Sequence, residues 1–317
     1  MADRGGVVFL GTPDFAVASL RALVEAGERV ELVVTQPDRR RGRAREPQPP
    51  PVKSFAVAHG IEVVQPESVR APEFLERFTA LGAEVAIVAA YGQILPRAML
   101  DAPTHGCLNV HASLLPRFRG ASPIQHAILE GDSVTGVTIM QMDEGLDTGG
   151  MLWTRELPIL PEDTAGTLHD RLAELGAEAL TEALGRLRRG ELSPVKQDDS
   201  QASYASMLRK SDGVLDWQDS AEQIQRRIAA MHPWPGAQTS LDGLRLKIHP
   251  PIAWEGGAHD AVPGTVIEVA DAGIRVACGE GSVSLFELQL EGRRRMPVAQ
   301  FLRGFPLEAG VRLGEVS

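Results

Sequence analysis

The amino-terminal half of the chain alternates short apolar runs with helical patterns, and this alternation limits the fold more than any other feature of the sequence. Four Val- and Ile-rich runs of about five residues have the length of strands: Val7–Gly11, Val30–Thr35, Ile61–Gln65 and Val85–Ala90. The run 85–90 contains no polar residue, which is typical of a parallel strand buried on both faces. Strands separated by helices predict an α/β fold with a Rossmann-like, doubly wound parallel sheet.

The segment between the first two runs has the boundary residues of a helix. Thr12 is the expected N-cap, Pro13 the expected first helical residue, and Gly27 the expected stop. The same order of residues recurs in the segment 122–131, with a serine, a proline and a terminal glycine. A rough stripe of leucines predicts a longer helix over residues 164–189.

The character of the sequence changes after this helix. Residues 191–208 are polar and unperiodic, which is typical of a linker. Beyond them, Asp242 and Gly243 lie between two extended runs and predict a β-hairpin, and residues 264–290 supply three more short strands. These strands predict a small OB-like β-barrel. We therefore expect a catalytic domain at 1–190, a linker at 191–208 and an OB-like barrel domain at 209–317.

Composition excludes several classes of protein. The formal net charge of −10 argues against general affinity for nucleic acid, so any such contact must come from local basic patches. No apolar run is long enough to span a membrane, and Met1–Gly6 is too polar for a signal peptide. The two cysteines, Cys107 and Cys278, have no metal-type spacing. We expect a cytoplasmic protein without a membrane segment, a disulfide framework or a metal site.

The strongest candidate for chemistry is a pair of polar residues in an alternating run. Asn109 and His111 lie two residues apart in the predicted strand 107–111, so their side chains share one face near its carboxyl end. Ligands bind at that end of open α/β sheets. An amide donates without charge and an imidazole exchanges protons near neutral pH. The Gly-interrupted loop with Asp143, Glu144 and Asp147 supplies a carboxylate, although a plain strand end and turn explain the same spacing.

Nucleotide cofactors are not indicated. The first strand-to-helix turn, FLGTPDF, lacks the G-x-G-x-x-G spacing that allows a backbone to approach a pyrophosphate, and the glycine-rich phosphate loop with its lysine is absent from the sequence. The scaffold resembles a nucleotide-binding fold used for another purpose, and a fold alone does not assign function.

A series of motifs resolves this question by resemblance. In order, FLGTPDF, TQPDRRRGR, AAYGQILP, CLNVHASLLPRFRGASPIQ and TGVTIMQMDEGLDTGGM resemble the folate-dependent formyltransferases. The similarity continues through YASMLRKSDGVLDW and HPWPGA into the second domain, so nearly the whole chain resembles the methionyl-tRNA formyltransferase family. The SLLPRFRG block alone is shared with formyltransferases and hydrolases that act on other amines.

The resemblance implies a reaction and a catalytic set. The donor would be 10-formyltetrahydrofolate as co-substrate, and the acceptor the α-amine of methionyl initiator tRNA, giving formylmethionyl-tRNA for translation initiation. Asn109, His111 and Asp147 match the catalytic residues of the family. We expect Asn109 and His111 to donate to an oxyanion, while Asp147 orients His111 and helps to relay a proton. The family also suggests a monomer.

The resemblance implies two binding surfaces as well. The residues expected to line the slot for the folate donor are Tyr91, Gln93, Ile94, Leu95, Ser113, Leu114, Leu115, Pro116 and Asp143. The residues expected to contact tRNA are Arg39, Arg41, Arg43, Arg45, Arg293, Arg294 and Arg295. Arg43 matches the arginine that matters most in the family. Further basic residues near the linker extend this predicted track: Arg186, Arg188, Arg189 and Lys196.

Two other functions are compatible with parts of the sequence. The same three residues can formylate an amino sugar or hydrolyse the formyl donor, and the arginine-rich loop with the barrel domain argues against a free small acceptor. A noncatalytic RNA-binding relative with a degenerate enzyme domain is the alternative from another class. The presence of Asn109, His111 and Asp147 together argues against it.

Overall fold

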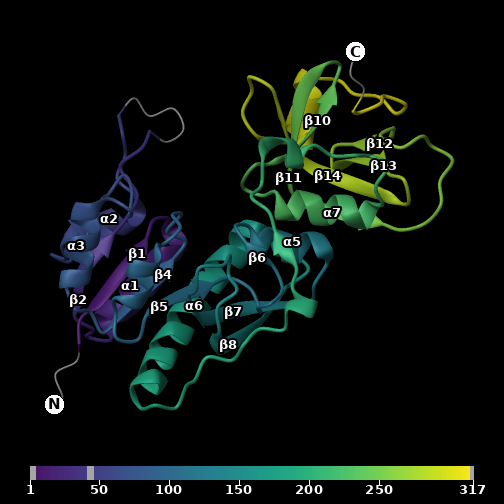
Figure 1. Ribbon diagram of the computed structural model, residues 1–317. Coiled ribbons are helices and arrows are strands. Elements are labelled where there is room, and N and C mark those ends of the chain that lie inside the picture. Colours follow the sequence, from purple (N-terminus) through teal and green to yellow (C-terminus); the bar gives the residue numbers. More distant parts are fainter. Residues whose placement is uncertain (1–4, 41–45, 315–317) are drawn as a thin grey trace. The chain divides into compact units, whose positions relative to one another are not determined.

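The computed structural model describes residues 5–40 and 46–314 and divides the chain into two compact units (Figure 1). The first comprises Met1–Pro123, Val134–Pro158 and His169–Ala205, and the second comprises Ile124–Ser133, Ile159–Leu168 and Ser206–Ser317. The second unit thus includes two short segments from the range 1–190, which we expected to form the first domain. Most of the predicted linker belongs to the first unit.

The first unit contains a seven-stranded sheet with the order β3-β2-β1-β4-β5-β7-β8. The strands are β1 (Val7–Gly11), β2 (Val30–Val34), β3 (Val63–Val64), β4 (Val85–Ala89), β5 (Cys107–His111), β7 (Val134–Gln141) and β8 (Met151–Pro158). The strands β1 to β5 pair in parallel, whereas β7 pairs antiparallel with β5 and β8 antiparallel with β7. The predicted Rossmann-like sheet is confirmed, and a hairpin extends it at one edge.

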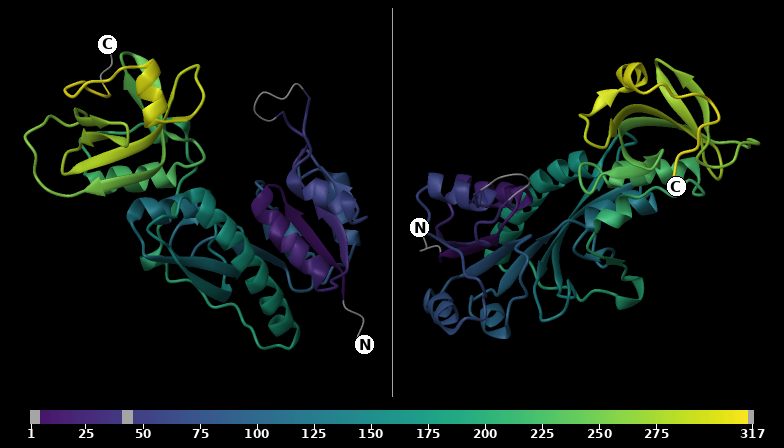
Figure 2. Two further views of the ribbon diagram at one scale, coloured as in Figure 1. Left: turned by 180° about the vertical axis from the view of Figure 1, so that it is seen from behind. Right: turned by 90° about the horizontal axis from the view of Figure 1, so that it is seen from above.

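Helices lie on both faces of this sheet (Figures 1 and 2). They are α1 (Asp14–Glu25), α2 (Pro51–Ala58), α3 (Pro72–Ala80), α4 (Arg97–Asp101) and α6 (Ala165–Arg188), whose first turn belongs to the second unit. Phe78 of α3 and Met99 of α4 are buried in one apolar cluster with alternate residues of β1, β2 and β4. On α6, a Cβ at Gly176 would lie 2.9 Å from the Cγ1 of Val110, so the absence of a side chain lets α6 approach β5 closely.

The start of α1 differs from the prediction. Pro13 occupies the N-cap position without a side-chain cap, so the expected Thr12 cap is wrong. The Thr12 hydroxyl instead donates to the carbonyl of Tyr91 at 3.1 Å and accepts from the backbone N–H of Gln36 at 3.4 Å. The Thr12 hydroxyl therefore links the segments that follow β1, β2 and β4, and it does not cap α1. Gly27, with a φ of 72°, follows the helix as predicted.

The second unit contains an antiparallel sheet with the order β10-β11-β14-β13-β12, and β15 pairs with β14. The strands are β10 (Ala237–Leu241), β11 (Leu244–Glu255), β12 (Val266–Ala270), β13 (Gly273–Ala277), β14 (Ser282–Leu290) and β15 (Met296–Pro297), and the helices include α5 (Pro123–Glu130), α7 (Ala221–Ala230) and α8 (Val298–Gly304). The hairpin at Asp242 and Gly243 is confirmed, with φ of 50° and 74°. The predicted antiparallel second domain is confirmed as well.

Two general properties of the described residues bear on function. In ranges 5–40 and 46–314, no group of three or more His, Cys, Asp and Glu side chains is arranged to hold a metal ion. No helix in the described part of the chain has the length and apolar character needed to cross a membrane.

Candidate active site

The three predicted catalytic side chains meet at the carboxyl end of β5. The Nδ2 of Asn109 lies 3.4 Å from Asp147 Oδ1, and the Nδ1 of His111 lies 3.7 Å from Asp147 Oδ2. His111 is 6% exposed and the Asp147 side chain 14% exposed. Residues i and i+2 of a strand share a face, and here both side chains of the pair contact the same carboxylate, as the alternating pattern predicts.

The hydrogen bond that orients His111 comes from a residue that the sequence did not single out. The Nε2 of His111 lies 3.0 Å from the carbonyl oxygen of Phe118. A carbonyl only accepts, so Nε2 carries a proton and Nδ1 is the nitrogen free to gain or lose one. Nδ1 faces Asp147 at a distance longer than a normal hydrogen bond. Asp147 thus places negative charge beside the exchanging nitrogen, while Phe118 sets the orientation of the ring.

Asp147 lies in the turn between β7 and β8 and has left-handed backbone geometry, with a φ of 53°. Its Oδ2 accepts a hydrogen bond of 2.8 Å from the backbone N–H of Gly120. Gly120 belongs to β6 (Arg119–Gly120), which pairs in parallel with β9 (Tyr204–Ala205). An amide donor, a ring nitrogen that exchanges a proton and a fixed carboxylate therefore converge, which suits an oxyanion and a proton relay.

The residues predicted to line the donor slot occupy several environments. Tyr91, Leu95, Ser113 and Leu115 are buried, whereas Ile94 is 75% exposed. The Tyr91 hydroxyl is buried and has no hydrogen-bond partner among the residues that the structure describes. Burial also raises the pKa of Tyr91 above its ordinary value. Tyr91 packs in the apolar cluster beneath α3 and α4, and the donor slot stays a prediction.

Two of the predicted slot residues have local structural contacts. The Asp143 carboxylate accepts hydrogen bonds from the backbone N–H of Gly145 at 3.0 Å and from the Thr148 hydroxyl at 2.7 Å. The Ser113 hydroxyl donates to the carbonyl of Arg117 at 2.6 Å. Asp143 therefore shapes the loop that carries Asp147, and Ser113 shapes the loop that follows β5.

The predicted tRNA contacts are only partly described. Arg41, Arg43 and Arg45 lie outside the described residues. Arg39 is exposed, and its backbone pairs with that of Gln48 in an antiparallel bridge. The loop that carries the arginines therefore has its two ends held together.

The arginines of the second unit are exposed at Arg293, Arg294 and Arg295. Arg295 pairs with Glu287 and also donates to the carbonyl of Pro250 at 3.0 Å. The guanidinium of Arg293 lies 5.8 Å from the centre of the Phe305 ring. Arg293 and Arg295 thus contact other residues of the second unit while they remain exposed.

The basic residues near the predicted linker are largely neutralised within the first unit. Arg188 binds Glu28 and Glu84 through four hydrogen bonds of 2.7 to 3.0 Å, and these bonds raise the pKa of its guanidinium. Arg186 pairs with Glu182, and Arg189 pairs with Glu191. Carboxylates therefore compensate the charge of three of the four residues that we expected to extend a basic track.

Two buried polar residues lie near Asp147 that no pattern in the sequence indicates. Arg119 is 2% exposed and Gln197 is 3% exposed. Gln197 lies in the segment 191–208, whose polar composition predicts a linker, and Arg119 lies in the SLLPRFRG motif, where nothing marks its side chain as buried. No local pattern distinguishes a buried glutamine from an exposed one.

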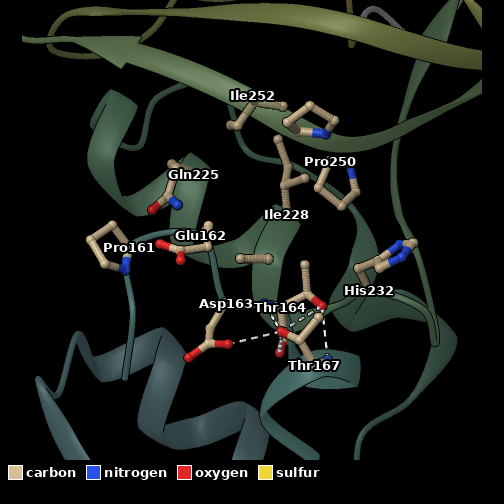
Figure 3. A pocket seen from close by; sticks show the side chains of 12 residues that line it. Pro161, Glu162, Asp163, Thr164, Thr167, Gln225, Ile228, His232, Pro250 and Ile252 are labelled. Atoms are coloured by element: carbon tan, nitrogen blue, oxygen red, sulfur yellow. Dashed lines mark hydrogen bonds between the residues drawn. The ribbon is translucent and has the colours of Figure 1, made fainter. Parts of the chain in front are cut away.

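The second unit has a separate cavity of about 520 Å³ (Figure 3). Pro161, Ile228, His232 and Ile252 help to line it, and burial lowers the pKa of His232. On its wall the Asp163 carboxylate accepts a hydrogen bond of 3.0 Å from the hydroxyl of Thr167. This cavity contains none of the three predicted catalytic residues.

Both thiols are expected to be inert. Cys107 and Cys278 are buried, and burial raises the pKa of each thiol to about 12. The thiolate is the reactive form of cysteine. We expect iodoacetamide at pH 8 to leave the native protein unmodified, as measured by intact mass. Urea-unfolded protein, which exposes both thiols, is the control, and rapid alkylation of the native chain would contradict the prediction.

Comparisons with known proteins identify the family of the chain. Residues 6–184 match the formyl transferase family, and residues 207–306 match the formyl transferase C-terminal domain. The methionyl-tRNA formyltransferase of Geobacter sulfurreducens is 50% identical over 98% of this chain and 96% of its own length. That of Aromatoleum aromaticum is 53% identical over 96% of both chains.

Solved structures share the fold at low sequence identity. HypX from Aquifex aeolicus, in complex with tetrahydrofolic acid, has a TM-score of 0.61 and 18% identity over 98% of this chain and 50% of its own. The sugar 3N-formyl transferase WlaRD has a TM-score of 0.64 and 17% identity over 92% of this chain and 100% of its own. The family match and the relatives of about 50% identity show that the chain is an enzyme that transfers a formyl group. More narrowly, the chain belongs to the methionyl-tRNA formyltransferase family.

Proposed function

We propose that this enzyme transfers the formyl group of 10-formyltetrahydrofolate to the α-amine of methionyl initiator tRNA, with Asn109, His111 and Asp147 as its catalytic residues. The product is formylmethionyl-tRNA, which serves translation initiation. The observation that supports the catalytic assignment is the convergence of these three side chains at the end of β5. The 50% identity to a methionyl-tRNA formyltransferase over nearly the full length supports the choice of acceptor.

The chemistry of the acceptor explains why no strong base is needed. A free α-amine has a pKa of about 8, and esterification of the adjacent carboxylate lowers this value by induction. Much of the acceptor is thus neutral near pH 7. The amine nitrogen forms a bond to the formyl carbon, the bond from that carbon to the donor nitrogen breaks, and a proton moves from the amine to the departing nitrogen. The costly species is the oxyanion between these two events.

The three side chains divide this work. The Asn109 amide donates to the oxyanion as it forms, and the protonated Nδ1 of His111 is the second donor, because Nε2 is held by Phe118. Asp147 takes the amine proton and passes it towards the leaving nitrogen. Its contact with the N–H of Gly120 keeps the carboxylate in place during both transfers.

The acceptor stem of the tRNA is proposed to bind the arginine loop, residues 39–48, with Arg43 as a principal phosphate contact. A hydrogen-bonded group of Asp38, Lys53 and Gln65, called here the buttress, lies next to the start of this loop. The Nζ of Lys53 donates to both oxygens of Asp38 at 2.9 and 2.8 Å and to Gln65 Oε1 at 2.7 Å. Gln65 Nε2 also donates to Asp38 Oδ1 at 2.7 Å, and the hydrogen bonds from Lys53 and Gln65 lower the pKa of Asp38.

Replacement of Lys53 by methionine is expected to loosen the base of the arginine loop and weaken tRNA binding. We expect the KM for methionyl-tRNA to rise about fivefold, as for loss of a charge-assisted contact, with a smaller effect on kcat. Arg43→Ala provides the comparison, because it removes a phosphate contact directly and should also reduce the dependence of KM on salt. An unchanged KM in Lys53→Met would contradict the role of the buttress.

The experiment that tests the proposed function compares three acceptors. Formyl transfer from 10-formyltetrahydrofolate is measured with methionyl initiator tRNA, free methionine and an amino sugar nucleotide, and formate release is followed in parallel. Product formation confined to the charged tRNA is the expected result. Formylation of the sugar, or release of formate alone, would overturn the acceptor, and no turnover with any acceptor would overturn the enzyme assignment.

The protein is further proposed to act as a monomer in the cytoplasm, where charged tRNA and the folate donor are available. Light scattering at the concentrations used for kinetics tests the first statement, and cell fractionation tests the second. A stable dimer would overturn the proposed oligomeric state without affecting the chemistry.

A further inference from the structure

A short segment with the composition of a linker contacts the backbone groups that hold His111 and Asp147 in place. Residues 197–205, called here the clamp segment, lie in the first unit. They include a 3₁₀ turn at Asp199–Gln201 and the short strand β9. Their composition is polar, but Gln197 is buried and Ser203 is half-buried.

Gln197 uses its whole side-chain amide to hold the loop of Asp147. Its Nε2 donates to the carbonyl oxygens of Asp147 and Gly149, each at 2.8 Å. Its Oε1 accepts from the Nε of Arg119 at 2.9 Å, and Arg119 also binds Asp199 at 2.8 Å. A buried amide with both donors and its acceptor engaged fixes the backbone that it touches, because breaking any of these bonds leaves a buried polar group unpaired.

This backbone needs such support because Asp147 has a φ of 53°, in the left-handed region that non-glycine residues rarely adopt. The left-handed geometry turns the carboxylate towards Gly120, Asn109 and His111. If the backbone relaxed to an ordinary conformation, the carboxylate would leave all three partners. Gln197 therefore acts on the chemistry through the conformation of Asp147.

Ser203 does the same for His111. Its hydroxyl accepts the backbone N–H of Phe118 at 2.9 Å, and its carbonyl accepts the N–H of Arg119 at 2.8 Å. Phe118 is also left-handed, with a φ of 58°, and its carbonyl is the group that binds the Nε2 of His111. The clamp segment thus holds both non-glycine residues of the site that have positive φ.

We propose that Gln197 and Ser203 are positioning residues for formyl transfer, and that the clamp segment sets the mutual placement of His111 and Asp147. This proposal rests on the catalytic roles given above to these two residues. Neither positioning residue is proposed to touch a substrate. Each fixes a backbone group that in turn places a catalytic side chain, and misplacement by about 1 Å is enough to slow a reaction strongly.

The test uses Gln197→Met and Ser203→Ala, which remove the side-chain hydrogen bonds, including the one to the Phe118 N–H, and keep most of the volume; the backbone bond from Arg119 to residue 203 remains. The clamp segment itself supplies matched controls, Gln201→Met and Ser200→Ala, whose side chains both donate to Asp198 at the start of the same turn. We expect kcat to fall about tenfold or more in the first pair, with little change in either KM and none of these effects in the controls. Thermal melts of all four variants show whether they remain folded at the assay temperature.

Combination with a change at Asp147 separates positioning from general loss of structure. Asp147→Asn removes the carboxylate, so adding Gln197→Met should cause little further loss of kcat, because the function it supports is already absent. Additive losses, or full kcat in both Gln197→Met and Ser203→Ala, would overturn the proposal. If Gln197→Met fails to fold, the milder Ser203→Ala decides alone. An active Asp147→Asn would instead overturn the catalytic role on which the proposal rests.

Discussion

Replacement of Asn109 by alanine is expected to lower kcat by about 100-fold to 1,000-fold, the loss typical of removing one oxyanion donor. The amide donates to charge that exists only in the transition state, so the KM values for both substrates should change little. In the structure without substrates, the Asn109 amide donates to Asp147 Oδ1 at the long distance of 3.4 Å. The free energy of unfolding should therefore change by much less than the activation free energy. Single-turnover formylation of methionyl-tRNA measures the effect.

The matched control for this variant is Asn109→Asp, which keeps the shape but replaces the donor by a second carboxylate next to Asp147. Because a negative charge opposes an oxyanion, we expect at least the same loss of kcat as in Asn109→Ala. A melt within the range of the native enzyme confirms that both variants are folded. Near-normal turnover in Asn109→Ala would rule out the oxyanion role, and His111 would then be left as the donor.

The strands of the sheet could be predicted because their signal is local. The apolar run 85–90 became β4 (Val85–Ala89), since a strand buried on both faces has no polar position to disguise it. The run 61–65 gave only Val63–Val64, at the edge of the sheet, where one neighbour is missing and pairing ends early. The antiparallel direction of β7 and β8 could not be read from their composition, because it depends on which neighbour each strand finds.

The catalytic set was predictable from spacing and resemblance, whereas its supports were not. Asn109 and His111 had to share a face of one strand, and the motif around Asp147 supplied the carboxylate. The bonds that hold these side chains join Gln197 to Asp147 and Ser203 to Phe118, which are far apart in the chain. A polar segment with distant partners has the composition of a linker, and only the folded structure shows that its residues are buried.

Replacement of Gly120 by alanine is the other change for which we expect a large loss of stability and activity. This residue has a φ of 119°, a conformation that L side chains rarely adopt, and a Cβ there would lie 2.6 Å from the carbonyl oxygen of Ala205. The obstacle is backbone in the clamp segment, so it cannot rotate away as a side chain would. In Gly120→Ala either β6 and β9 separate or Gly120 turns, and both movements withdraw the N–H that binds Asp147 Oδ2.

We expect Gly120→Ala to lose about 2 kcal/mol or more of unfolding free energy from strain and overpacking, and about 100-fold in kcat from misplacement of Asp147. Gly60→Ala is the matched control. Gly60 also has a positive φ, of 68°, but a Cβ there would have no atom within 4 Å. It should therefore cost about 1 kcal/mol of backbone strain without loss of kcat. Calorimetric melts measure the loss of unfolding free energy, and steady-state formylation measures the loss of kcat. If Gly120→Ala were destabilised as expected but kept full kcat, the pairing of β6 with β9 would support only the fold, and the placement of the Asp147 carboxylate would have to depend on Gln197 alone.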